Sequence, residues 1–360
     1  MRWYNTYLCF MPKNKTILVA PLHWGLGHAS RCIPIINALL THDFNVIVAS
    51  DGGALLLLQK EFPQLESIQL PSYNITYPKK GGHFKWKFLL KLPAIQQTIT
   101  SEKKVIATLV SEGKIDGIIS DNRFGVRNKK VPSVFVTHQL NVLSGKTTRV
   151  SSKLHQKVIK KFDACWVPDV EAPVNLSGKL GHLEKDLLNT KYIGPLSRMV
   201  KHERAIKYDI LALLSGPEPQ RSLLEEKLLT ELKGSDKEVL LVQGMMEKTQ
   251  KRSVSENITI VNFMLSTELE HAINESDLVV SRSGYTTIMD LASLEKKAFF
   301  IPTPGQYEQE YLAKKLKRKG IVPSCKQRNF SVKKLEKVIA YKGLSGFKVE
   351  QDFKELFSLF

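Results

Sequence analysis

Short runs of β-branched residues alternate with longer segments of helical periodicity along this chain, and the alternation starts again near the middle. Gly, Pro, Asp or Ser bounds each run. Such alternation is typical of βα units, in which helices connect and cover parallel strands. Two successive series of such units predict an α/β protein with two doubly wound parallel sheets.

The expected elements can be placed by residue number. In the first half, strands are expected at 16–20, 45–50, 117–120, 133–137 and 164–167, with helices near 29–41, 53–61, 92–112 and 151–161. In the second half, strands are expected at 209–215, 239–243, 259–263, 278–281 and 298–301, with helices near 221–233, 267–274, 285–294 and 307–319.

A break between the halves is expected near residue 198. Gly194-Pro195 interrupts any regular element, and a charged run follows at 201–204. A chain of 360 residues is long enough for two domains that each bury a core. We therefore predict an N-terminal domain at 1–198 and a C-terminal domain at 199–360.

The charge balance restricts the partners. The chain carries 53 Lys and Arg against 35 Asp and Glu, a formal charge of +18, which favours an anionic partner such as nucleic acid, a lipid surface or a phosphorylated substrate. Nucleic acid is not expected, because no recognisable binding module is present. No stretch approaches the roughly 20 apolar residues of a membrane-spanning helix.

The four cysteines indicate a reducing compartment. They lie far apart, without a CxxC pair or histidines at metal-ligand spacing, so neither a zinc site nor a disulfide framework is expected. Residues 1–12 lack the cleavage site of a signal peptide, and we interpret them as an extension. These features predict a cytoplasmic protein.

Polar residues follow the strands of the first half. In open parallel sheets, ligands bind beyond the carboxyl ends of the strands, so these positions are informative. Gly25-Leu26-Gly27-His28 follows the first strand and allows a ligand phosphate or sugar to approach the backbone, although it is equally compatible with a packing turn. It departs from the dinucleotide motif GxGxxG at Ser30, so NAD is not expected.

Two further strand ends carry polar side chains. Asp121, Asn122 and Arg123 follow the third strand, and His138 and Asn141 follow the fourth. An Asp-Asn turn is the alternative for the first group. Three polar strand ends around one crevice nevertheless predict a pocket for an acceptor, with His28 able to remove a proton from its hydroxyl.

The second half contains two glycine-containing turns before helices. Ser215-Gly216 leaves backbone N–H groups available for a phosphate, although the adjacent prolines also suit a rigid turn. Arg282-Ser283-Gly284 opens directly into a helix, whose positive end suits a diphosphate. Asp290 could accept hydrogen bonds from ribose hydroxyls, and Gln309 and Glu310 from sugar hydroxyls.

The stretch from Arg282-Ser283-Gly284 to Asp290, followed by Gln309-Glu310-Tyr311, resembles a known signature in order and spacing. It is similar to the donor-binding signature of the MurG-like branch of GT-B glycosyltransferases, whose type member adds N-acetylglucosamine to a lipid-linked peptidoglycan precursor. The resemblance runs along most of the chain and implies two Rossmann-like domains facing an interdomain cleft. The family usually has a second Gln where Glu310 stands.

The resemblance also implies roles for individual residues. It places Asp290 on the ribose, Gln309 and Glu310 on the donor sugar, and Phe263-Met264 beside the uracil. Ser215 and Gly216 would lie at the donor phosphates, with Arg282, Ser283 and Gly284 completing the donor set. In the first half, Gly25, Gly27 and His28 match the family's glycine-rich loop, and His138 and Asn141 resemble its acceptor-site residues. The glycine-rich loop has the form of a less studied bacterial subgroup.

These observations predict an inverting, metal-independent transferase. A sugar, N-acetylglucosamine or another hexose, would move from a UDP-sugar to a lipid-linked or other anionic cell-envelope glycan. His28 is the first choice for the base, with Asp121 and His138 as rivals. No cofactor is expected beyond the UDP-sugar co-substrate. The metal-binding DxD motif is missing, and we interpret Asp169-Val170-Glu171 as a coincidental near match.

Two other functions fit the same fold. One is a sugar-nucleotide isomerase of the UDP-N-acetylglucosamine 2-epimerase type, and the other is a non-catalytic subunit that binds sugar nucleotides. A membrane contact is also expected, since Phe84, Lys85, Trp86, Lys87 and Phe88 alternate apolar and cationic side chains. That pattern suits the inner face of the cytoplasmic membrane, and it also fits a half-buried amphipathic element.

Overall fold

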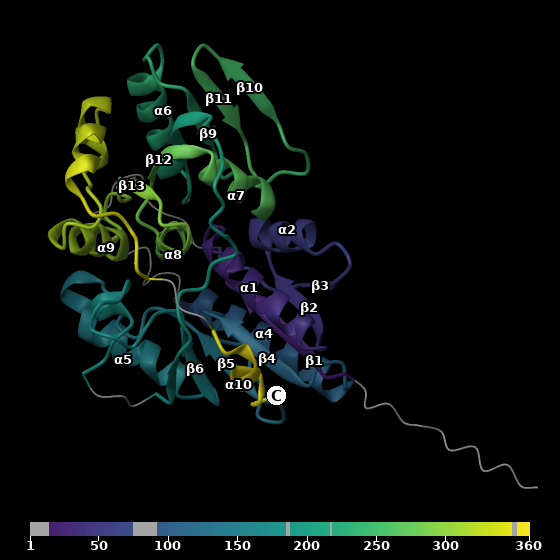
Figure 1. Cartoon of the computed structure of the whole chain (residues 1–360). Helices are drawn as coiled ribbons and strands as arrows, with labels where there is room; N and C mark the ends of the chain where they lie inside the picture. The colour runs from purple at the N-terminus through teal and green to yellow at the C-terminus, as the bar shows by residue number, and fades with distance from the viewer. Residues whose placement is uncertain (1–13, 75–91, 185–187, 217, 348–350) are drawn as a thin grey trace, which may run out of the picture.

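Two parallel sheets, each covered by helices, form the two halves of the protein (Figure 1). The computed structural model describes residues 14–74, 92–184, 188–216, 218–347 and 351–360. The predicted membrane segment at 84–88 and the N-terminal extension lie outside these residues. The predicted α/β architecture is confirmed.

The first sheet has seven strands in the order β3-β2-β1-β4-β5-β6-β7, all parallel. They are β1 (Thr16–Pro21), β2 (Asn45–Ser50), β3 (Glu66–Gln69), β4 (Gly117–Asp121), β5 (Ser133–Val136), β6 (Ala164–Val167) and β7 (Thr190–Tyr192). The helices of this half are α1 (Gly27–Thr41), α2 (Gly52–Glu61), α4 (Leu92–Ser111) and α5 (Thr148–Ile159), with short 3₁₀ turns at Gly145–Thr147 and Gly178–Leu180.

The second sheet has six strands in the order β10-β11-β9-β8-β12-β13. They are β8 (Tyr208–Leu213), β9 (Val239–Val242), β10 (Arg252–Ser255), β11 (Ile258–Val261), β12 (Ser276–Ser281) and β13 (Lys297–Phe300). The helices are α6 (Gln220–Leu232), α7 (Ser266–Asn274), α8 (Tyr285–Ser293), α9 (Tyr307–Arg318) and α10 (Phe353–Phe357), with 3₁₀ segments η4 (Gln327–Asn329) and η5 (Val332–Ala340).

The central strands are buried on both faces, which explains their continuous apolar runs. Residues 17–20 of β1 are completely inaccessible, and so are Val279 and Val280 of β12. Helices cover both faces of a parallel sheet, so such strands have no polar side to alternate with the apolar one. The burial of β1 and β12 places their carboxyl ends, and the loops that follow them, in the middle of the molecule.

Three strands were not predicted from the sequence, and all three lie at sheet edges. β3 contains Glu66 and Gln69, β7 is three residues long, and β10 is exposed throughout. β10 pairs antiparallel with β11 and is the exception to the parallel arrangement of its sheet. An edge strand has one neighbour and buries less apolar surface, so its sequence carries little periodic signal.

The end of the chain returns to the first sheet. In α10, the Phe357 ring lies 5.7 Å from Phe44 and 6.3 Å from Trp166, and Phe360 lies 6.2 Å from Trp166, measured between ring centroids. A Cβ atom added to Gly117 would lie 2.5 Å from the Phe360 ring. The predicted boundary near 198 falls between β7 and β8, and the final residues of the predicted second domain complete the core of the first.

We expect Phe360→Ala to lower the free energy of unfolding of the first half by about 3 kcal/mol, because it removes a buried ring from beside Trp166 and leaves a cavity. Guanidinium unfolding followed by tryptophan fluorescence measures this. Leu359→Ala is the matched control, since that neighbouring side chain is 38% exposed. Equal effects of the two substitutions would contradict the packing described here.

Candidate active site between the two halves

The N-terminal ends of α1 and α8 meet at the contact between the halves. Thr286 Oγ1 donates a hydrogen bond to the Gly27 carbonyl over 3.0 Å, and a Cβ on Gly27 would lie 3.2 Å from that hydroxyl oxygen. Glycine therefore permits the close approach. The first N–H groups of a helix have no partner inside the helix and carry partial positive charge, so this junction suits an anionic group.

His28 forms a hydrogen bond with a buried carboxylate at this junction. Its Nδ1 lies 2.8 Å from Oδ1 of Asp121, the last residue of β4. Burial alone would raise the pKa of Asp121, but Arg31 and the His28 hydrogen bond hold that pKa well below its usual range. An ionised oxygen beside Nδ1 favours the proton on that nitrogen, which leaves Nε2 of His28 as a proton acceptor.

His138 connects the two halves. Arg31 Nη1 lies 2.8 Å from its Nδ1, and its Nε2 lies 2.8 Å from Oε1 of Glu308 on α9. Its ring stacks on Tyr285, the first residue of α8, with centroids 4.3 Å apart. Burial lowers the pKa of His138, and Arg31 adds to this effect. The contacts with Arg31 and Glu308 occupy both ring nitrogens of His138.

Arg123, a predicted acceptor residue, makes its contacts within the protein in this structure. Its guanidinium is completely buried and donates to Asp51, to Glu102 and to the carbonyls of Pro21 and Pro71. A buried charge is tolerated when carboxylates and carbonyls surround it in this way. Arg123 thus ties β4 to the loops after β1 and β3 and presents no group to a ligand.

Arg282, a predicted donor residue, is likewise buried and paired within the protein. Its guanidinium donates to the carbonyls of Gln220, Ile301 and Pro302. Burial lowers the pKa of Arg282 to about 10. The Arg282 side chain holds the loops after β12 and β13 against α6. These hydrogen bonds fix the start of the turn at Ser283 and Gly284.

The remaining predicted acceptor residues are Gly25, Asn122 and Asn141, and the last two have separate partners. Gly25 has a φ of +78°, which glycine adopts without strain. Asn122 donates to Oδ1 of Asp121 over 3.1 Å. Asn141 donates to the carbonyls of Lys179 and His182, so its amide holds a loop in place.

The predicted donor residues lie on the opposite side of the junction. Ser283 Oγ donates to the Gln309 carbonyl, and Gln309 Oε1 accepts the N–H of Thr303, so the loops after β12 and β13 are locked together. Glu310 accepts the N–H of Gly305. Asp290 accepts a hydrogen bond from Ser197 over 2.8 Å. The structure thus brings Ser283 and Gln309 together.

The other predicted donor residues lie at the ends of neighbouring strands. Phe263 and Met264 follow β11 and are buried, and Ser215 and Gly216 follow β8 and are half-buried. Gly216 has a φ of +101°, outside the range of other residues. None of these contacts identifies a ligand, so the donor assignments stay predictions.

Sequence reasoning gave no role to Arg31, Gln139 or Glu308. Arg31 lies one turn after His28 on α1, a spacing that places both side chains on one face. That spacing was a usable signal. Glu308 lies in the first turn of α9 and accepts hydrogen bonds from His138 and Gln139 of the first half. A contact across two domains has no signature in the local sequence.

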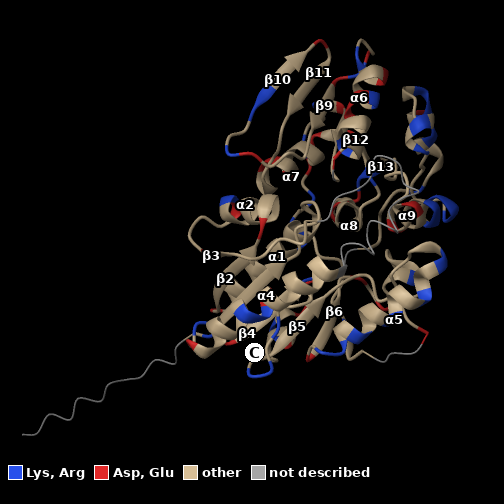
Figure 2. Ribbon diagram, turned by 180° about the vertical axis from the view of Figure 1, so that it is seen from behind, with Lys and Arg blue, Asp and Glu red and all other residues tan. Residues whose placement is uncertain are grey.

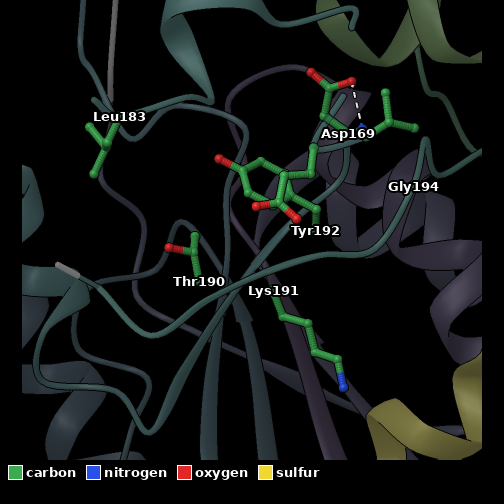
Figure 3. Close-up of a pocket in the computed structure, with 8 residues that line it drawn as sticks. Asp169, Leu183, Thr190, Lys191, Tyr192 and Gly194 are labelled. Carbon is green, nitrogen blue, oxygen red and sulfur yellow. Dashed lines mark hydrogen bonds between the residues drawn. The ribbon is translucent and has the colours of Figure 1, made fainter. Parts of the chain in front are cut away.

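A cavity of about 510 Å³ opens beside β6 and β7, lined by Asp169, Leu183, Thr190 and Tyr192 among others (Figure 3). The Asp169 carboxylate accepts the N–H groups of Val170, Leu176 and Ser177. It is thus part of the loop structure. Within the described ranges, no group of three or more His, Cys, Asp or Glu side chains has the arrangement of a metal site.

The chain is similar to known glycosyltransferases. Residues 220–345 match the glycosyltransferase family 28 C-terminal domain. An uncharacterized glycosyltransferase of Methanosarcina mazei is 23% identical over 316 residues, which cover 82% of each chain. The UDP-N-acetylglucosamine--N-acetylmuramyl-(pentapeptide) pyrophosphoryl-undecaprenol N-acetylglucosamine transferase of Haemophilus ducreyi is 22% identical over 77% of this chain and 78% of its own. Because the relatives include archaeal proteins, the similarity extends beyond the bacterial subgroup expected from the sequence.

Solved structures show the same fold. The MurG structure from Acinetobacter baumannii superposes with a TM-score of 0.51 and 14% identity, covering 91% of this chain and 90% of that one. The glycosyltransferase of kitacinnamycin gives a TM-score of 0.60 at the same identity and coverage. The predicted GT-B fold is confirmed.

The buried carboxyl of Asp290 should make stability depend on pH. Burial raises its pKa to about 6, against about 3.9 in an unfolded chain. The folded protein therefore binds an extra proton between about pH 4 and 6, and the stability linked to it is present below pH 4 and lost as pH rises through 6. From pH 4 to 7, we expect wild type to lose about 3 kcal/mol relative to Asp290→Asn.

Urea unfolding of both proteins across this pH range measures the difference. Asp236→Asn is the control, because the Asp236 side chain is 87% exposed. Parallel curves for wild type and Asp290→Asn would show that the carboxyl titrates normally.

Proposed function

We propose that this protein, a MurG-like GT-B glycosyltransferase, transfers a hexose such as N-acetylglucosamine from a UDP-sugar to a hydroxyl group of a lipid-linked or cell-envelope glycan. The observation that carries the proposal is the pairing of His28 with buried Asp121 directly beside the meeting point of α1 and α8. A proton acceptor and an anion-binding helix end thus lie together between the halves.

The choice of donor rests on the relatives. The Haemophilus ducreyi protein is named for UDP-N-acetylglucosamine, and one structural neighbour, a glycosyltransferase of Streptomyces, was solved with thymidine diphosphate. Both ligands carry a nucleoside diphosphate. The N-terminal end of α8, beginning at Tyr285 after the Ser283-Gly284 turn, would receive this group, because its first N–H groups point outward.

The proposed reaction is a direct displacement with inversion. The acceptor oxygen forms a bond to the anomeric carbon while the bond from that carbon to the diphosphate oxygen breaks, and UDP leaves with the electron pair. His28 Nε2 takes the acceptor's proton, and Asp121 stabilises the resulting imidazolium. The helix end supports the negative charge that develops on the diphosphate. The proposal requires no metal.

The contacts favour His28 over its two rivals as the base. Asp121 is completely buried and held by Arg31, so it is not accessible to an acceptor. His138 has both nitrogens engaged, by Arg31 and by Glu308. The His28 side chain is 15% exposed, and in the part of the chain that the structure describes only its Nδ1 has hydrogen-bond partners. A base must reach the acceptor hydroxyl, and His28 meets this requirement.

We expect His28→Ala to lower turnover by about 10²–10⁴-fold while the dissociation constant for UDP-N-acetylglucosamine changes little, because proton removal acts in the transition state. Calorimetric titration and UDP release measure the two quantities. The control is His202→Ala, whose side chain is 51% exposed. Near-normal turnover would remove His28 as the base.

The same measurements separate the alternative functions. Isomerised donor without any acceptor would favour an epimerase, and binding without turnover under all conditions would favour a binding subunit. No affinity for UDP or its sugars would overturn the proposed function.

We also propose that the protein works at the inner face of an anionic membrane. Val150 and Leu154 lie one turn apart on α5 and are 61% and 59% exposed. Exposed cationic side chains flank them on the same helix, including Lys153 and Lys157. Figure 2 shows further basic residues on neighbouring α9. Apolar side chains surrounded by cationic ones suit a lipid-linked acceptor at a membrane surface.

No helix in the described part of the chain has the length and apolar character needed to cross a bilayer. Association would therefore be peripheral. It would be driven by charge and by the two exposed aliphatic side chains of α5.

The double variant Lys153→Glu/Lys157→Glu should bind vesicles containing phosphatidylglycerol about thirtyfold less tightly at low salt, since each surface cation contributes about 1 kcal/mol. Flotation of the protein with vesicles measures this. Lys333→Glu/Lys337→Glu makes the same charge change on η5 and is the control. A wild-type protein that ignores anionic vesicles would contradict the membrane proposal.

A further inference from the structure

Three polar side chains of the site meet at the guanidinium of Arg31, which is 1% exposed. Its Nε and Nη2 donate to the two oxygens of Asp121, and its Nη1 lies 2.8 Å from Nδ1 of His138. A guanidinium is a planar fork that matches a carboxylate with two parallel hydrogen bonds. Because the fork is rigid, the third donor has a fixed direction, and it points at His138.

The contact with Arg31 fixes the protonation of His138. A guanidinium can only donate, so Nδ1 of His138 must accept and carries no proton. Nε2 then carries the proton of the neutral ring and donates it to Glu308 Oε1, 2.8 Å away. The His138 ring lies between Arg31 and Glu308, and these two contacts select its Nε2–H tautomer.

Arg31 acts on His28 through Asp121. His28 Nδ1 lies 2.8 Å from Asp121 Oδ1, and Arg31 Nη2 is 2.9 Å from the same ring nitrogen. One N–H of Nη2 donates to Asp121 Oδ1 and holds that oxygen beside the ring, so a proton on Nδ1 leaves the pair of Arg31 with Asp121 intact. A lone pair on Nδ1 would face an ionised oxygen, so Nδ1 carries the proton, and His28 takes the tautomer opposite to that of His138.

We propose that Arg31 is a positioning residue for the transfer reaction, assigning the two histidines opposite tautomers so that His28 faces the acceptor and His138 joins the first half to α9. This inference rests on the proposed function. Arg31 contacts neither substrate and acts through Asp121, His28 and His138. The groups that contact the two imidazoles are Arg31, Asp121, Tyr285 and Glu308. Cys32 donates to Asp121, and Gln139 donates to Glu308.

The tautomers can be observed directly in the full chain by long-range ¹H–¹⁵N correlation spectra of the histidine side chains. Signals are assigned with His28→Gln and His138→Gln. We expect His28 as the Nδ1–H tautomer and His138 as the Nε2–H tautomer at neutral pH. The Nδ1–H tautomer on His138, or the Nε2–H tautomer on His28, would overturn the proposal without any variant of Arg31.

Arg31→Lys tests the role of the fork. Lysine keeps the charge but is a single point donor that cannot hold Asp121 bidentately and reach His138 as well. We expect His138 to populate both tautomers and to titrate at higher pH than in wild type. Glu308→Gln keeps an acceptor at α9, and we expect it to leave the His138 tautomer unchanged, because Arg31 selects it.

Arg123→Lys is the matched control for the cost of placing a lysine at a buried site. Arg123 is as deeply buried and pairs with Asp51 and Glu102, but it contacts neither His28 nor His138. The Arg123→Lys variant should lose stability as Arg31→Lys does, while the signals of His28 and His138 stay as in wild type. Equal histidine changes in the two variants, or none in Arg31→Lys, would reduce Arg31 to a structural residue.

Release of UDP from UDP-N-acetylglucosamine supplies the kinetic readout. We expect Arg31→Lys to lower kcat by about 10²-fold with KM nearly unchanged, since misplacing a catalytic group costs about this factor. An unchanged kcat, or a loss confined to KM, would contradict the proposal. If wild type releases no UDP at all, the proposed function fails, and the spectra still decide whether Arg31 sets the tautomers.

Discussion

The close contact between the N-terminal ends of α1 and α8 is the constraint on which the arrangement of this site depends. Gly27 has no side chain, so Thr286 can reach its carbonyl, and Tyr285 can stack on His138. Two helix ends of like partial charge then lie side by side, an arrangement that repels unless an anion or other acceptors lie between them. Here the side-chain hydroxyls of Thr286 and Tyr285 donate to the carbonyls of Gly27 and Pro168, so these two contacts do not engage the N–H groups of the helix ends. A diphosphate between the helix ends would accept from those N–H groups.

Three buried arginines hold the loops around this contact. Their charged guanidinium groups are paired with different kinds of acceptor. Arg123 has two carboxylates, Arg31 has one carboxylate and an imidazole, and Arg282 has carbonyl oxygens alone. The absence of a carboxylate explains why burial lowers the pKa of Arg282. Arg123 and Arg282 follow strands and therefore resemble ligand-binding residues in sequence, yet both bind the protein itself here.

Burial also determines which parts of the structure could be predicted from the sequence. Central strands such as β1 and β12 are apolar on both faces and were predicted closely, whereas β3, β7 and β10 at the edges gave no periodic signal. His28 and Asp121 were predicted as neighbours, because both follow strands of one sheet. The hydrogen bond between His138 and Glu308 was not predicted, since it joins residues that are 170 positions apart and lie in different halves of the protein. The return of Phe360 to the first sheet was missed for the same reason.

The positive charge of the protein belongs to its outer surface more than to its candidate active site. Arg31 is balanced by Asp121, His138 is neutral, and Glu308 adds a negative charge, so this cluster carries no excess of cations. The arginine nearest the α8 turn, Arg282, faces away from it. A diphosphate held there would consequently depend on helix ends and N–H groups, which act over short distances. The exposed lysines of α5 and α9 act over a Debye length of about 10 Å, so under the proposed function they would attract anionic surfaces and substrates before the short-range contacts form.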